Sequence, residues 1–232
     1  MDMTHISPDQ VIYTHIGPFA ISATLVYTWL IILLLVTLSI MITRRLSSGP
    51  KMSRGQNVME ILVGGLLSQI RDVSGEDPEP YLGFVGTLFV FIVISNVLAV
   101  VPGFTPPTAS LSTTAALAIC VFVAVPFYGI SSQGFGSYMK LYIKPSVFML
   151  PFNIMGELSR TLALAVRLFG NMMSATKIVM ILLAVAPLFF PVVMNALGLL
   201  TGIIQAYIFA ILAMVYIASA SQARKKTEEK GK

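Results

Sequence analysis

Residues 151–185 form the stretch PFNIMGELSRTLALAVRLFGNMMSATKIVMILLAV, which is apolar over most of its length. A helix crosses the ~30 Å hydrocarbon core of a bilayer with ~20 residues, because each residue advances it by about 1.5 Å. This stretch is too long to stand upright in a membrane, so we predict a strongly tilted helix. A second over-long apolar stretch, residues 192–220, follows the short uncharged turn APLFFP at 186–191. Together they predict an antiparallel helical hairpin.

The composition of the chain also indicates a membrane protein. Of its 232 residues, 56% are hydrophobic and only 11% are charged, which is typical of an integral membrane protein. Three further apolar stretches are long enough to span a membrane: residues 21–43, 81–101 and 111–130. We therefore predict an all-α integral membrane fold, in which residues 1–232 form a single membrane domain with five spanning helices.

Residues 56–71, between the first two spans, carry apolar and polar side chains on opposite faces of a predicted helix. Such a pattern is typical of an amphipathic helix that lies at the membrane interface, here on the cytoplasmic side. The apolar face is expected to hold Met59, Val63, Leu66, Leu67 and Ile70, and the polar face Glu60, Ser68 and Arg71.

Lysine and arginine are unevenly distributed among the segments that connect the spans. Residues 1–20, 102–110 and 186–191 contain none, whereas the loops after the first and third spans and the tail 221–232 are basic. Short cytoplasmic loops retain positive charge, so we predict an exported N-terminus and a cytoplasmic C-terminus. The basic residues of the predicted cytoplasmic side include Arg44, Arg45, Lys51, Arg54, Arg71, Lys140, Lys144, Arg224, Lys225, Lys226, Lys230 and Lys232.

Several classes of function are disfavoured by what the chain contains. Its net charge of +5 is dispersed over short loops and the tail, a pattern that does not predict nucleic-acid binding. The lone Cys120 and the isolated His5 and His15 do not predict a metal site. No GxxxxGK[ST] loop occurs, so we expect neither an ATP site nor a cofactor. No internal repeat is recognisable, which counts against inverted-repeat transporters.

One face of the fourth span carries a polar stripe. Glu157 and Arg160 are three residues apart and can neutralise each other. Arg167 has no acidic residue one turn to either side, although an arginine at the membrane centre costs ~3 to more than 10 kcal/mol. The stripe follows spacings of three and four residues through Glu157, Arg160, Leu164, Arg167, Asn171 and Ser174.

Two interpretations of Arg167 remain open from the residues alone. Its side chain either reaches backbone carbonyls or headgroups, or meets a carboxylate. Apart from Glu157, the acidic residues of the chain lie in termini, loops or the interfacial helix, so such a carboxylate would come from another subunit. In the fifth span, Gln205 is either an interhelical contact or an ion-path residue on the hairpin partner of Arg167. The span also contains Asn195 and Thr201.

The runs RLFGNM at 167–172, LPFN at 150–153 and QAYIFAILAMVYIASA at 205–220 resemble subunit a of F-type ATP synthases. NVLAVVPGFTPPTAS at 96–110 extends the resemblance more loosely. The resemblance implies a non-catalytic stator subunit of a rotary ion-translocating complex in a bacterial or archaeal plasma membrane. Its implied partners are a ring of c subunits that each carry a membrane carboxylate, the peripheral-stalk b subunits, and indirectly the soluble F1 head.

The resemblance also implies roles for single residues. Arg167 corresponds to the arginine that attracts each ionised c-ring carboxylate and blocks leakage between two ion half-channels, and Asn171 and Gln205 correspond to positions beside it. A guanidinium suits this role because it stays protonated where a lysine would lose its charge. We take as ion-path candidates Asn171, Gln205, Glu157, Arg160, Ser174, Thr201 and Lys177.

The chain departs from the common family pattern at two positions. Thr176 and Gly198 stand where many relatives carry an ionisable residue for the outer half-channel. Residues 159–166 also contain no Pro and, after Ser159, lack the Ser that usually precedes the arginine. These features resemble a divergent, sodium-linked branch, so H⁺ and Na⁺ both remain candidates for the coupling ion. A self-contained ion transporter or channel and a structural membrane scaffold are the competing functions.

Overall fold

The computed structural model describes residues 12–16, 19–44, 54–75, 77–101, 104–136, 138–139, 148–185 and 190–222. Several segments used in the charge argument therefore lie outside the described residues. They are residues 1–11, most of the turn at 186–191, the tail from 223 to 232, and Arg45, Lys51, Lys140 and Lys144.

The prediction of an all-α membrane fold is confirmed. Within the described ranges, five helices are long and apolar enough to cross a membrane. Their ends differ from the predicted ones by a few residues at most. They are α1 (Ala23–Thr43), α3 (Glu79–Leu98), α4 (Leu111–Gln133), α6 (Met149–Val185) and α7 (Phe190–Gln222).

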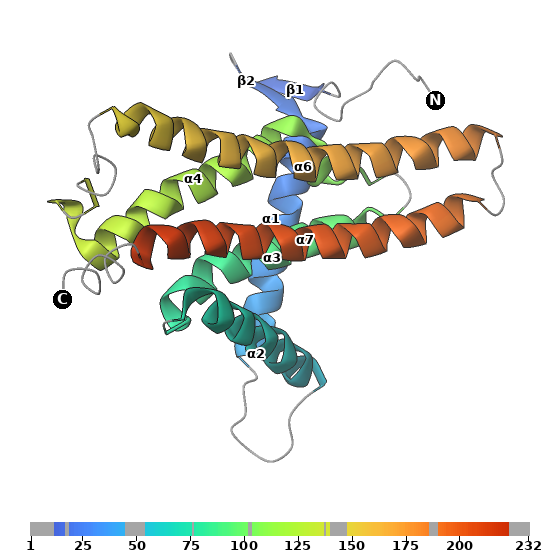
Figure 1. Ribbon diagram of the computed structural model, residues 1–232. Coiled ribbons are helices and arrows are strands. Elements are labelled where there is room, and N and C mark those ends of the chain that lie inside the picture. Colours follow the sequence, from blue (N-terminus) through green and yellow to red (C-terminus); the bar gives the residue numbers. More distant parts are fainter. Residues whose placement is uncertain are drawn as a thin grey trace.

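Helices α6 and α7 contain 37 and 33 residues, which corresponds to lengths of about 55 and 50 Å. Both run across the direction of α1 in Figure 1 instead of alongside it, and they pack against each other over much of their length. The predicted antiparallel hairpin is therefore present. If α1 spans the bilayer directly, helices as long as α6 and α7 must tilt strongly to remain within the hydrocarbon core. Their crossing of α1 provides this tilt.

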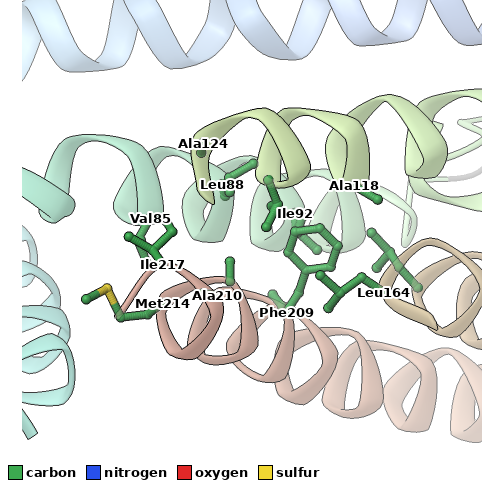
Figure 2. Close-up of a cluster of buried hydrophobic side chains, with 14 of the residues drawn as sticks. Val85, Leu88, Ile92, Ala118, Ala124, Leu164, Phe209, Ala210, Met214 and Ile217 are labelled. Carbon is green, nitrogen blue, oxygen red and sulfur yellow. The ribbon is translucent and has the colours of Figure 1, made fainter. Parts of the chain in front are cut away.

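The bundle core forms where α7 packs against α3, α4 and α6. Figure 2 shows Phe209 of α7 between Ile92 of α3 and Leu164 of α6, and all three side chains are at most 1% exposed. Small side chains on α7, such as Ala210, let the helices approach closely. Close van der Waals packing stabilises such contacts in a membrane, because lipid is as apolar as the helix surface.

Helix α2 (Arg54–Ser74) is the predicted amphipathic helix, and it packs on α7 and α3. Leu66 and Ile70 are buried, while the polar side chains of Glu60, Ser68 and Arg71 are exposed, as expected. Val63 is on the same face of the helix but lies outside this contact, with 37% of its side chain exposed. Leu67 is half-buried, and the side chain of Met59 lies outside the described ones.

An antiparallel strand pair precedes α1 and was not predicted. It consists of β1 (Ile12–Ile16) and β2 (Phe19–Ser22), with His15 opposite Ala20 and a register irregularity between Ile12 and Thr14. Both strands are rich in β-branched and aromatic residues and are separated in the sequence by Gly17 and Pro18, which is a hairpin pattern. The short 3₁₀ helix η2 (Pro107–Ala109) lies between α3 and α4.

Candidate functional site

Arg167 lies near the middle of α6 with its side chain exposed. Within the part of the chain that the structure describes, its guanidinium makes no hydrogen bond or ion pair. Its neighbours Leu164 and Leu168 are buried at 1% and 0% exposure, so the helix face beside Arg167 packs into the bundle. Arg167 therefore lies at the edge of the packed face, where its side chain is accessible to a neighbouring molecule.

The polar stripe of α6 follows this same edge. Glu157 and Asn171 are half-buried, whereas Arg160 and Ser174 are exposed like Arg167. Leu164 is the one member of the predicted stripe that is buried in the core. The exposed members of the stripe can contact a neighbouring molecule, while the half-buried members lie closer to the contact between α6 and α7.

Three contacts define how α6 and α7 pair. A Cβ atom built on Gly198 would lie 3.8 Å from Ala175, and one on Gly202 would lie 3.1 Å from Met172 Cε. At the other end of the hairpin, Arg160 Cζ lies 5.7 Å from the ring centroid of Tyr216. In antiparallel helices such pairs have a nearly constant sum of residue numbers, and this register places Gln205 within about one helical turn of the level of Arg167.

Gln205 is 5% exposed, and its Nε2 has no hydrogen-bond partner among the described residues. A buried amide of this kind normally finds a partner, since an unpaired donor costs about 1–3 kcal/mol. The sequence left Gln205 open as an interhelical contact or an ion-path residue. Its unpaired donor does not support a hydrogen-bonded contact between helices within the described chain.

At one end of the hairpin, a cleft gathers the polar side chains of Glu157, Arg160 and Thr161 against Tyr216 and Ser219. Its remaining wall comes from α4. The expected partner of Arg160 was Glu157, whereas the contact seen for its guanidinium is the Tyr216 ring. Glu157 has a polar interaction of its own. The cleft thus combines a carboxylate, a cation and hydroxyl groups at one end of α6.

Beyond Arg167 in the other direction, hydroxyl groups bond to their own helices. Thr176 Oγ1 donates to the carbonyl oxygen of Met172 at 2.9 Å, and Thr201 Oγ1 donates to that of Leu197 at 3.0 Å. Since each donor is used, the hydroxyl oxygens can still accept hydrogen bonds or contact a cation. Lys177 is half-buried on α6 in the same part of the hairpin.

Sequence reasoning missed two features beside these residues. Tyr216 was not identified as a contact of Arg160, and Asn96 of α3 was not identified as a buried side chain that bonds to α7. The polar Asn96 in an apolar span was a usable signal. Its partner was not readable, because Asn96 and Gly202 are 106 residues apart.

Comparison with known proteins gives a consistent result over nearly the whole chain. The model of the family "ATP synthase A chain" matches residues 25–218. ATP synthase subunit a 2 of Acaryochloris marina is 58% identical over 218 residues, which cover 94% of this chain and 93% of that protein. ATP synthase subunit a of Albidiferax ferrireducens is 58% identical over 97% of this chain and 98% of its own length. ATP synthase subunit a 1 of Prosthecochloris aestuarii is 55% identical over 95% and 99%.

Proposed function

The chain belongs to the ATP synthase A chain family, and from this premise we propose that its α6–α7 hairpin forms two ion half-channels against a rotating c-ring. As a member, it is the stator subunit of the membrane sector and a multi-pass membrane protein. The chemistry of ATP belongs to other subunits of the complex. The proposal concerns how this chain handles the ion.

The observation that carries the proposal is the exposed Arg167 without a partner in the described chain. Desolvating an unpaired guanidinium in a membrane costs several kcal/mol, so a counter-charge is expected on the surface that meets it. A carboxylate on each c subunit supplies that charge in turn. Because arginine stays protonated at any accessible pH, each ionised carboxylate is attracted, while a free cation is repelled from crossing between the half-channels.

The two half-channels open on opposite sides of Arg167. On the cytoplasmic side, the proposed path is the cleft that contains Glu157, Arg160 and Ser219. On the outer side, it follows the half-buried Asn171 and Lys177. Ser174, Thr201 and Gln205 complete the proposed set. This assignment assumes that the N-terminus lies outside and the C-terminus in the cytoplasm of a bacterial or archaeal cell.

The coupling ion is H⁺ or Na⁺ in this proposal. Thr176 and Gly198 supply no titratable group to the outer path, whereas hydroxyl and amide oxygens are available beside it. Oxygen ligands of this type can pass a hydrated or partly hydrated cation as well as a proton. The peripheral-stalk b subunits and the F1 head would hold the chain against rotation and connect it to ATP hydrolysis.

The test is ATP-driven ion uptake by inverted membrane vesicles that contain the whole complex with Arg167→Ala or Arg167→Lys. We expect both variants to lose uptake while ATP hydrolysis by the head persists, the lysine variant because desolvation favours its neutral form. Arg71→Ala on the exposed face of α2 is the matched arginine control and should pump normally. Coupled uptake by Arg167→Ala would exclude the mechanism and favour a scaffold role. Assays with and without sodium at fixed pH identify the ion.

A further inference from the structure

A chain of buried hydrogen bonds joins three elements next to the hairpin. Thr108 Oγ1 of η2 donates to Asn96 Oδ1 of α3 at 2.8 Å, and Asn96 Nδ2 donates to the carbonyl oxygen of Gly202 of α7 at 2.8 Å. Thr108 is 0% exposed and Asn96 is 2% exposed. Both polar atoms of the Asn96 amide are therefore used within the protein, which is the arrangement of a structural contact and not of an open ion path.

Gly202 makes this contact sterically feasible. A Cβ atom at this position would lie 3.0 Å from Asn96 Cβ and 3.1 Å from Asn96 Nδ2. The carbonyl oxygen of Gly202 lies inside a helix, where it also accepts the hydrogen bond of its own turn, and its second lone pair receives the asparagine. A side chain at residue 202 would push α3 and α7 apart and break this bond.

The contact lies at the point where the hairpin leaves the bundle. Of the α7 residues from Phe190 to Thr201, only Pro191 is buried, whereas the helix is buried at every turn from Gly202 to its end. On α6, no side chain described beyond Met172 is buried. The outer arms of both helices thus extend past the bundle, as the right-hand part of Figure 1 shows.

We propose that Thr108, Asn96 and Gly202 anchor the α6–α7 hairpin to the rest of the stator, just outside the level of Arg167. The proposal rests on the proposed function, because a c-ring that turns against the hairpin exerts a lateral force on it. Apolar packing alone resists such sliding poorly, since lipid and side chain are similarly apolar, whereas hydrogen bonds are directional. The anchor lies one turn from Gln205, and Gly202 contacts Met172 of α6. The three residues are positioning residues for Arg167 and Gln205.

The anchor is tested in inverted vesicles with the whole complex by Thr108→Val, which keeps the shape and removes the donor, and Thr108→Ser, which restores the donor. The measured quantity is ion uptake per ATP hydrolysed at equal amounts of complex. We expect Thr108→Val to reduce it by about tenfold and to increase passive leakage after the head is removed, because small misplacements have large effects on positioned groups. Thr108→Ser should remain close to the unmodified protein.

Ser95→Ala is the matched control. Ser95 is buried beside Asn96 at 0% exposure, but its Oγ donates only to the carbonyl oxygen of Phe91 in its own helix, at 2.8 Å. This variant also removes a buried hydroxyl group, yet it cuts no bond between elements, so coupling should persist. If Thr108→Val pumps as many ions per ATP as Ser95→Ala, the anchor is refuted.

A second variant covers the case in which Thr108→Val does not accumulate in the membrane. Gly202→Ala keeps every donor and acceptor but displaces Asn96, and should lower coupling in the same way. Gly83→Ala, where a Cβ atom meets nothing within 4 Å, is its control. If neither Thr108→Val nor Gly202→Ala assembles while both controls do, the hydrogen-bond chain is only a folding contact and the proposal is wrong.

The two proposals fail in different ways. ATP-driven uptake by Arg167→Ala would refute the proposed ion mechanism, regardless of the coupling measured for Thr108→Val and Gly202→Ala. Loss of uptake in Arg167→Ala together with normal coupling in Thr108→Val would refute only the anchor proposal.

Discussion

Two buried amide side chains of the bundle differ in what they bond to. Asn96 bonds Thr108 and the carbonyl oxygen of Gly202, whereas Gln205 Nε2 has no partner within the described residues. A satisfied buried amide contributes to a unique packing arrangement, and an unsatisfied one reduces stability. Proteins break this rule mainly where function requires it. The contrast supports a structural role for Asn96 and a functional role for Gln205.

Replacing Gln205 with leucine should therefore separate stability from function. We expect Gln205→Leu to raise the free energy of unfolding by about 1 kcal/mol, because an unpaired donor is removed at similar volume, and to lower ATP-driven ion uptake. Thermal denaturation of the purified complex, followed on this subunit, measures the first effect. Asn96→Leu is the comparison, and it should destabilise by about 1–3 kcal/mol because it leaves Thr108 unpaired. Equal destabilisation by both variants would contradict the argument.

At the scale of elements, α2 supports α7 from one side. Ile70 is 1% exposed in the contact of α2 with the bundle, and on α7 the hydroxyl of Tyr207 donates to Gln69 Oε1 at 2.7 Å. Ile61 lies on the same helix but is 69% exposed. The stabilising face of α2 is therefore narrow, and it is centred on Leu66 and Ile70.

Two substitutions of the same residue type test this face. Ile70→Ala should lower the free energy of unfolding by about 2–4 kcal/mol, because it leaves a cavity in a packed contact. Ile61→Ala should change it by less than about 0.5 kcal/mol. Denaturation of the purified complex compares the two variants. A larger effect at Ile61 would mean that its exposed face is covered in the assembled complex.

The spans and the amphipathic helix could be predicted because each depends on length and on periodicity within one segment. Which part of the apolar face of α2 is packed could not be predicted: Ile70 is buried and Val63 is exposed, because this depends on how α2 meets α3 and α7. Arg167 was identifiable from the absence of a nearby carboxylate. The Tyr216 ring beside Arg160 and the bond from Asn96 to Gly202 were not, because only the packing of distant helices brings these pairs together.

At the scale of the whole molecule, the charge distribution predicts the direction in which every span crosses the membrane. Helix α3 is a suitable reporter because both ends are described and differ in character. Asp77, just before it, is exposed and follows the basic segment that contains α2. Val101, just after it, is 52% exposed and leads into residues 102–110, which contain no lysine or arginine. Positive charge is retained on the cytoplasmic side, so α3 should run from the cytoplasm outward.

Thiol labelling of whole cells tests this direction. In a Cys120→Ser background, which removes the one native cysteine, Val101→Cys should react with a membrane-impermeant maleimide added outside, and Asp77→Cys should react only after the membrane is opened. Retained ATP-driven uptake by the background variant shows that the replacement leaves the subunit assembled. The reverse labelling pattern would invert the assignment of the Glu157 cleft, since the orientation of α6 follows from that of α3 and from the number of crossings between them.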